Sequence, residues 1–269
     1  RFDWKPTKEK PRLLLHFGAA DWRANVWVND KRVGEHTGGY DPFTFDITDA
    51  LREGENDFFV GVADPTDTGT QPRGKQVLKP HGIFYTAVTG IWQTVWLEPV
   101  AEQHIESFTV VPDIDRKVAT VTVQATGKGE ITVQTIDRKR SDTGKPHVVA
   151  ERDKAGESLE LSLPMPELWS PENPALYDLE ITLWDGDRIV DHVRGYFGMR
   201  KIEVKKDADG VNRLWLNDKV VFQYGPLDQG WWPDGLYTAP TDEALKYDIE
   251  MTKKFGMNMI RKHVKVEPA

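Results

Sequence analysis

The 269-residue sequence contains no cysteine, which excludes disulfide bonds, thiolate catalysis and cysteine-ligated zinc. It has no run of about 18 apolar residues, so we expect no membrane partner. Basic residues are in the minority, because 35 Lys and Arg stand against 43 Asp and Glu, for a net charge of −8. This balance disfavours nucleic acid as a partner, since nucleic-acid binding needs a basic face.

Short motifs that hold metals, phosphates or nucleophiles are also missing. No two of the seven histidines have the spacing of a His-x₃-His pair, and no serine lies in Gly-x-Ser-x-Gly. A glycine-rich phosphate loop is absent as well. We therefore expect no metal site and no cofactor.

What the sequence does contain is a long series of short strand patterns. Residues 1–101 have alternating apolar runs separated by turn residues, and a long polar segment at 64–82 interrupts them without periodicity. Many short strands without a helical period predict a jelly-roll β-sandwich. Residues 102–199 repeat the pattern on a smaller scale and predict an immunoglobulin-like β-sandwich. The expected fold class is therefore mainly β.

From residue 200 the pattern changes. A hairpin at 214–222 and a loop at 226–240 precede the first helical pattern, at 242–255, and an apolar run at 257–260 follows it. Strand, helix and strand in this order predict a βαβ unit, the first part of an incomplete TIM barrel at 200–269. A complete barrel needs about 200–250 residues, so we expect this chain to be part of a longer protein. The start, without an initiator Met or a signal peptide, agrees with that expectation.

Taken together, four stretches resemble glycoside hydrolase family 2, the group of β-galactosidases, β-glucuronidases and β-mannosidases. The resemblance is carried by residues 22–43, 89–97, 168–200 and 258–263, the last reading Asn-Met-Ile-Arg-Lys-His. These stretches occur in the domain order of the family and extend over nearly the whole chain. The resemblance implies a sugar-binding jelly roll, an immunoglobulin-like domain and the start of a barrel.

The resemblance also implies a retaining glycosidase that cleaves terminal β-linked sugars from glycans or oligosaccharides. Its two glutamates, an acid/base and a nucleophile, are expected on later barrel strands beyond Ala269, so this chain has no predicted catalytic residue. A stand-alone carbohydrate-binding β-sandwich protein without enzymatic activity is the alternative, and an inert truncation product is a third reading. The barrel-like end of the chain favours the first hypothesis.

Substrate-binding candidates lie at the expected strand ends of the barrel. Asp228 follows the first expected barrel strand, and barrel active sites form at the carboxyl ends of strands. Trp231 and Trp232 come next and offer indole faces for stacking on a sugar, with packing beneath the loop as the ordinary alternative. Arg261 and His263 match the family motif at the second strand in part, with a salt-bridged strand end as the alternative.

One further candidate lies in the jelly roll. Asp64 begins the long polar segment, and in the family a jelly-roll loop reaches toward the barrel mouth. A solvated surface loop is the alternative reading. The expected partner is a carbohydrate substrate, and a homo-oligomer stays open. The compartment is unknown from the sequence, with the periplasm or secretion favoured for the parent protein.

Overall fold

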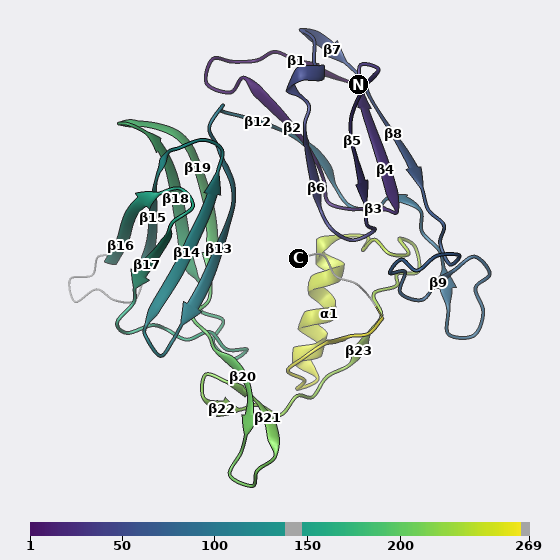
Figure 1. Ribbon diagram of the computed structural model, residues 1–269. Coiled ribbons are helices and arrows are strands. Elements are labelled where there is room, and N and C mark those ends of the chain that lie inside the picture. Colours follow the sequence, from purple (N-terminus) through teal and green to yellow (C-terminus); the bar gives the residue numbers. More distant parts are fainter. Residues whose placement is uncertain (138–146, 265–269) are drawn as a thin grey trace. The chain divides into compact units, whose positions relative to one another are not determined.

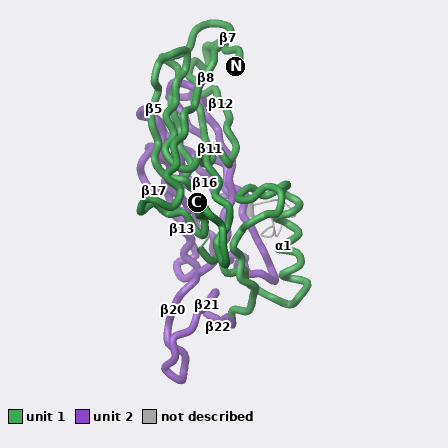
Figure 2. The backbone as a smooth tube through the Cα atoms, turned by 90° about the vertical axis from the view of Figure 1, so that its right-hand side faces the viewer, with its two compact units in different colours: residues 1–100, 223–269 green, residues 101–222 purple. Residues whose placement is uncertain are grey.

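The computed structural model describes residues 1–137 and 147–264 (Figure 1). The chain divides into two compact units, residues 1–100 with 223–269, and residues 101–222 (Figure 2). Each unit contains a β-sandwich with its own apolar core. The domain boundaries expected at 101/102 and 199/200 stay a prediction.

The sandwich of the first unit consists of two three-stranded sheets, with the orders β12-β2-β6 and β5-β4-β8. Along β2 and β4 every second residue is buried, because successive side chains of a strand point to opposite faces. The buried residues of the two strands meet in one core with Ile47. The strands are β2 (Arg12–Phe17), β4 (Arg23–Val28), β5 (Lys31–Thr37), β6 (Phe43–Asp46), β8 (Phe58–Ala63) and β12 (Val95–Val100).

Shorter elements extend this sandwich at its edges and ends. Two pairs are antiparallel, β1 (Phe2–Trp4) with β7 (Gly54–Asn56) and β3 (Ala20–Asp21) with β11 (Gly90–Ile91). A 3₁₀ turn, η1, covers Thr48–Ala50. The long polar segment also gains structure that its composition does not reveal. It contains β9 (Gln76–Val77), which pairs in parallel with β10 (Tyr85–Thr86).

The second unit is the expected immunoglobulin-like sandwich. Its sheets have the orders β13-β14-β17 and β16-β15-β18-β19. The alternating Val and Leu positions of β14, β17 and β18 fill the core between them. The strands are β13 (Ile105–Asp113), β14 (Val118–Ala125), β15 (Glu130–Asp137), β16 (His147–Lys154), β17 (Ser158–Ser162), β18 (Tyr177–Asp185) and β19 (Arg188–Phe197).

A three-stranded antiparallel sheet, which includes the hairpin β21–β22, completes the second unit. It comprises β20 (Ile202–Lys206), β21 (Asn212–Leu216) and β22 (Lys219–Val220) in the order β20-β21-β22. Lys201 links this hairpin to the sandwich, because its ammonium group lies 2.9 Å from Asp115 and 2.8 Å from Asp218. The hairpin predicted at residues 214–222 is therefore present.

The end of the described chain forms a small βαβ arrangement within the first unit. Strand β23 (Leu227–Asp228) pairs in parallel with β24 (Arg261–Lys262), and helix α1 (Asp242–Lys254) connects them. The predicted helix is confirmed, with the Thr241 hydroxyl accepting a hydrogen bond from the Ala244 amide. Both strand positions differ from expectation. β23 lies inside the segment predicted to be a loop, so Asp228 ends a strand instead of following one, and β24 begins after the apolar run at 257–260.

Close contact between residues 224–225 and residues 258–259 explains why the strands lie at these positions. Tyr224 and Asn258 are joined by two hydrogen bonds of 2.9 Å, from the Asn258 amide to the Tyr224 carbonyl and from the Tyr224 amide to the Asn258 side chain. Gly225 then approaches Met259 so closely that a Cβ atom at position 225 would lie 1.8 Å from the Met259 oxygen. This alignment, and not side-chain periodicity, decides which residues pair. The mainly β fold class is confirmed, and the TIM barrel itself stays a prediction.

We predict that α1 exchanges its amide hydrogens much faster than the sandwich strands. No residue of α1 is buried, and an isolated helix of 13 residues is marginal in water. The strands β2 and β18, by contrast, alternate fully buried residues. Hydrogen exchange followed by mass spectrometry should show early exchange at 242–254 and slow exchange at 12–17 and 177–185. Equal protection of the three segments would contradict this prediction.

Candidate functional site

The paired strands β23 and β24 bring two of the predicted regions to one edge. Leu227 pairs with Arg261 and Asp228 with Lys262, and the His263 amide donates to the Asp228 carbonyl at 2.8 Å. Because the strands are parallel, their carboxyl ends lie at the same edge. Asp228 and His263 are therefore neighbours in space although 35 positions separate them in sequence.

Side-chain alternation divides these residues into two pairs. The Asp228 carboxylate forms an ion pair with Lys262 and also accepts a hydrogen bond from the Gly230 amide at 2.6 Å. On the neighbouring positions, an Arg261 guanidinium nitrogen lies 3.5 Å from His263 Nδ1. Lys262 belongs to this edge although it was not a sequence-based candidate. Its only sequence signal was its place between Arg261 and His263.

The long segment of the jelly roll reaches this edge. Gly74 has a φ of +61°, and a Cβ atom there would lie 2.5 Å from the carbonyl oxygen of Val264, the residue after His263. Only glycine combines that backbone angle with such a close approach at little cost. The site therefore includes a jelly-roll loop as well as the ends of β23 and β24.

The two predicted tryptophans have different surroundings. Trp231 stacks on Tyr85 with ring centroids 5.0 Å apart and an interplanar angle of 11°, and Tyr237 meets it edge-on at 5.1 Å. Trp232 is partly exposed, and its backbone exchanges two hydrogen bonds with Leu236. One face of Trp231 is thus already in contact with an aromatic ring, which leaves Trp232 the better placed of the two for a ligand.

An aromatic cluster fixes the loop of these tryptophans to the jelly roll. Tyr237 is buried and meets Trp92 edge-on at 4.6 Å and Tyr40 at 5.7 Å. The Thr238 hydroxyl donates to the Trp92 carbonyl at 2.9 Å, and the Trp92 indole donates to the Gly39 carbonyl at 2.7 Å. Such edge-to-face contacts combine apolar burial with a favourable quadrupole geometry.

Asp64, the remaining candidate, organises its own loop. Its carboxylate accepts hydrogen bonds from the Thr66 amide at 2.6 Å and from the Thr89 hydroxyl at 2.7 Å. It lies partly buried and lines a small closed space together with Asp21 and Gln76. These contacts support a role in loop architecture, while its sugar-contact role stays a prediction.

Asp21 is a buried acid of this region with a raised pKa. Only 6% of its surface is exposed. Burial raises its pKa to about 6, the negative charge of Asp64 adds to that effect, and a hydrogen bond with Gln76 opposes it. A Cβ atom at Gly39 would lie 2.7 Å from its carboxylate, so the glycine at this position makes room for the acid.

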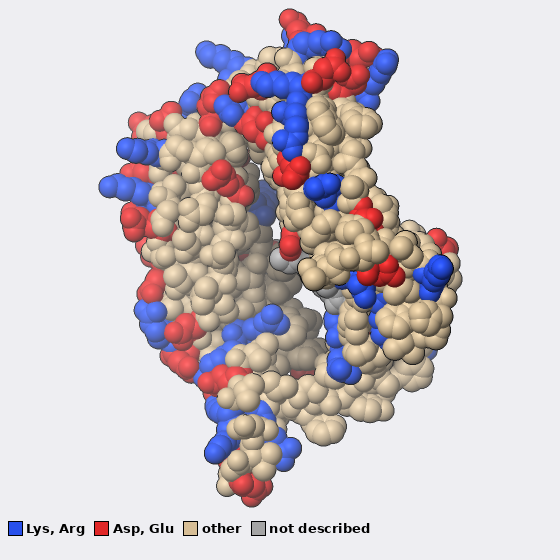
Figure 3. Space-filling view, turned by 45° about the vertical axis from the view of Figure 1, so that its right-hand side comes forward, with Lys and Arg blue, Asp and Glu red and all other residues tan. Residues whose placement is uncertain are grey.

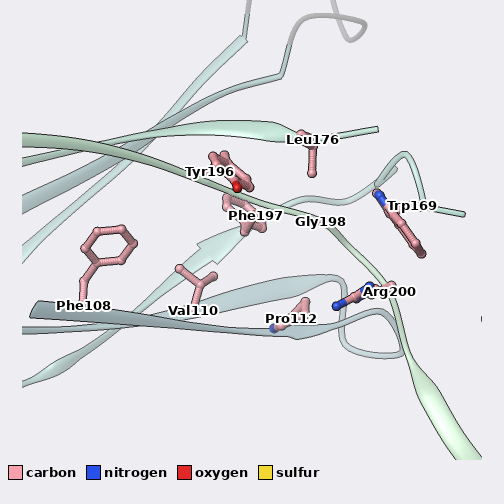
Figure 4. A pocket seen from close by; sticks show the side chains of 9 residues that line it. All are labelled: Phe108, Val110, Pro112, Trp169, Leu176, Tyr196, Phe197, Gly198 and Arg200. Atoms are coloured by element: carbon pink, nitrogen blue, oxygen red, sulfur yellow. The ribbon is translucent and has the colours of Figure 1, made fainter. Parts of the chain in front are cut away.

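The second unit has a separate concavity of about 540 Å³ between the edge strands β13 and β19. Figure 4 shows aromatic and aliphatic side chains from both strands around this gap, with Arg200 close to Trp169 at one end. The guanidinium of Arg200 lies 4.8 Å from the centre of the Trp169 ring. No sequence signal had marked this groove.

Within the described residues, neither surface charge nor a metal-binding cluster distinguishes these sites. Figure 3 shows Lys and Arg interspersed with Asp and Glu over the face in view. Within residues 1–137 and 147–264, no group of three or more His, Asp or Glu has the geometry to hold a metal ion. Over the same residues, no helix has the length and apolar character needed to cross a bilayer.

Comparison with known proteins identifies the family. The description "Glycosyl hydrolases family 2, sugar binding domain" matches residues 4–97, and "Glycosyl hydrolases family 2" matches residues 103–200. The chain belongs to glycosyl hydrolases family 2. Its two sandwiches are the matched domains of that family, in the order that the sequence interpretation predicted.

Relatives of this family 2 chain include a β-galactosidase and a β-glucuronidase. It is 27% identical to a β-galactosidase of Thermoanaerobacter pseudethanolicus over 93% of this chain and 34% of that protein. It is 30% identical to a β-glucuronidase of Rattus norvegicus over 75% of this chain and 34% of that protein. The chain thus spans about a third of the length of these curated relatives.

Solved structures agree on the fold. The β-glucuronidase of Ruminococcus gnavus in complex with D-glucuronic acid aligns with a TM-score of 0.77 at 22% identity. The alignment covers 96% of this family 2 chain and 44% of that chain. At this identity the likeness establishes the fold alone.

We predict that Gly74→Ala destabilises the family 2 chain more than Gly82→Ala. Both glycines have positive φ, +61° and +56°, but a Cβ atom at position 82 meets nothing within 4 Å. Gly82→Ala therefore measures backbone strain alone, about 1 kcal/mol. Gly74→Ala adds a collision with the Val264 backbone and should also speed hydrogen exchange at 261–264. If urea unfolding shows equal losses of unfolding free energy in the two variants, the loop around Gly74 does not contact this edge.

We also predict a pH-dependent effect of Asp21→Asn. The folded-state pKa of Asp21 is raised above 3.8, so the protonated form favours folding and this stabilisation is lost as pH rises through about 6. The unfolding free energy of Asp21→Asn, compared with that of the natural chain at the same pH, should therefore rise by up to about 2 kcal/mol from about pH 4 to pH 8. Unfolding free energies at both values test this, with the exposed Asp209→Asn as the control. A constant difference would refute it.

Proposed function

We propose that this chain is the accessory part of a retaining glycosidase that removes terminal β-linked sugars from glycans or oligosaccharides. Its two sandwiches would support the catalytic barrel, and β23 and β24 would form the first edge of the active site. The observation that supports this proposal most directly is the parallel pairing of β23 with β24, which joins Asp228 to the Arg261–His263 segment at one edge. Barrel enzymes place their active sites at such carboxyl ends.

In this proposal the strand-end residues bind the sugar and do not react with it. Arg261 offers fixed donors, and His263 offers a donor or acceptor, for the hydroxyl or carboxylate groups of a sugar. Lys262 balances the charge of Asp228, and the Gly230 amide orients the carboxylate. Trp232 would stack on the apolar face of the ring, and Trp231 would support it from the aromatic cluster.

The chemistry itself needs two carboxyl groups about 5–5.5 Å apart, one to attack the anomeric carbon and one to protonate the leaving oxygen. Asp21 and Asp64 are close enough to interact electrostatically. Asp21 is too deeply buried to reach a sugar, and Asp64 is held by Thr66 and Thr89. We propose, as the resemblance to family 2 implies, that the catalytic pair belongs to residues outside this chain.

The second candidate function is a stand-alone carbohydrate-binding protein. The two sandwiches suit that function as well as they suit a glycosidase. A binding protein has no use for the β23–α1–β24 arrangement, however, nor for a jelly-roll loop that touches its edge at Gly74. These two features favour the glycosidase.

We predict that this chain alone hydrolyses no sugar and that a version extended to the length of its relatives hydrolyses one. Nitrophenyl β-glucuronide, β-galactoside, β-mannoside and β-glucoside form the panel. In the extended protein, His263→Ala should lower kcat/KM by about 100-fold, because a polar contact to the bound sugar is lost. Lys246→Ala, on the exposed face of α1, is the control and should leave kcat/KM unchanged.

Two results would contradict the proposal. Activity of this chain by itself would mean that its own carboxylates act. An extended protein that cleaves none of the four glycosides, although folded by circular dichroism, would favour the binding protein.

A further inference from the structure

The outward face of the sheet β5-β4-β8 carries polar and aromatic residues in a regular arrangement. Along β4, Arg23, Asn25 and Trp27 alternate with buried residues, so all three point away from the core. Their neighbours on β8 are Ala63, Gly61 and Phe59, and those on β5 are Thr37, Glu35 and Arg32. None of these residues has a role in the proposed glycosidase function.

One end of the face is an aromatic platform. Trp27 and Phe59 are registered partners with ring centroids 5.6 Å apart, and Phe59 is 65% exposed. Gly61 follows on the same side, where a Cβ atom would lie 3.5 Å from the Trp27 ring. A larger side chain there would cover the indole, and glycine leaves it open. A depression of about 380 Å³ lies beside the platform.

The middle of the face is polar and pre-arranged. The Arg32 guanidinium donates to the Asn25 side-chain oxygen at 2.7 Å and to Glu35 at 2.9 Å. These bonds fix the amide and the carboxylate in place. Among residues 1–137 and 147–264, the Asn25 amide nitrogen has no hydrogen-bond partner, so it can donate to a ligand while the oxygen beside it is held by Arg32.

The other end of the face is a second shallow groove, of about 430 Å³, lined in part by Trp22, Arg23 and Thr37. The five residues from Arg23 to Trp27 are separated by four steps of about 3.3 Å and span about 13 Å along the strand. That length fits about two or three sugar rings. The small neighbours Gly61 and Ala63 keep the path between the grooves low.

We propose that this face is a second, non-catalytic site that binds a neutral oligosaccharide, with one ring on Trp27 and Phe59 and the next along Asn25 toward Arg23. Aromatic rings pack on the C–H faces of sugars, while amide, guanidinium and carboxylate groups bond their hydroxyls. Four acids line the two grooves against one arginine, Arg23, and Arg32 beside them is paired with Glu35, so an anionic sugar is disfavoured. The acids are Asp30, Asp57, Glu35 and Asp64.

The opposite sheet shows why exposure of a tryptophan is not sufficient. Trp96 on β12 is 45% exposed, but His16 stacks on its ring at 4.8 Å with an interplanar angle of 9°. His16 is in turn held by Glu98 at 2.9 Å. The face of Trp96 is therefore occupied, and Trp96→Ala is a matched control for Trp27→Ala.

Isothermal titration calorimetry of the full chain with cellohexaose, xylohexaose and mannohexaose tests this site, with a glucuronic-acid oligosaccharide as the anionic probe. We expect at least one neutral probe to bind and the anionic probe to bind at least tenfold more weakly. Trp27→Ala should weaken binding at least tenfold. Gly61→Leu, which keeps the indole and covers it, should do the same, and Trp96→Ala should leave affinity unchanged. Circular dichroism confirms folding of each variant.

Three results would overturn the proposal. These are no heat of binding from any neutral probe, unchanged affinity in Gly61→Leu, or equal losses in Trp27→Ala and Trp96→Ala. A concentration-dependent dimer that Trp27→Ala abolishes in analytical ultracentrifugation would assign the face to a second copy of the chain instead. The outcome is independent of the proposed glycosidase, because loss of this site leaves hydrolysis of small nitrophenyl glycosides by the extended protein unchanged.

Discussion

The aromatic contact between Tyr237 and Trp92 is the constraint on which the candidate site depends. Tyr237 belongs to the loop after β23, and Trp92 belongs to the jelly roll. Their packing, together with the hydrogen bond from Thr238 to the Trp92 carbonyl, holds a segment with few buried residues against a rigid sandwich. Without it, the two-residue pairing of β23 with β24 would have little to support it.

This anchoring connects the jelly roll of this family 2 chain with the β23–α1–β24 arrangement. The jelly roll supplies both the aromatic partner of the loop and the segment around Gly74 that touches the end of β24. The strand-end edge is thus assembled from three parts of the sequence. A short parallel pair gains its precision from the elements packed around it, since loops positioned by a rigid scaffold commonly carry function.

Buried polar groups mark the same region. Asp21 is surrounded by Gly39, Asp64 and Gln76, in a space too small for an exposed ligand site. Its raised pKa is a cost of burial and not a sign of catalysis, because no sugar can reach it. The open aromatic face around Trp27 is the reverse case, where exposed rings and fixed polar groups are accessible to a ligand.

The two sandwiches, helix α1 and the family can all be predicted from the sequence. Those features depend on local signals: alternation of apolar residues, the Thr241 cap and stretches such as 22–43. Tertiary contacts, by contrast, produce the short strands β9, β23 and β24, the Asp228–Lys262 ion pair and the covered face of Trp231. Two-residue strands have no periodicity to detect, and each of these contacts joins residues distant in sequence, so their formation depends on packing that no local pattern encodes.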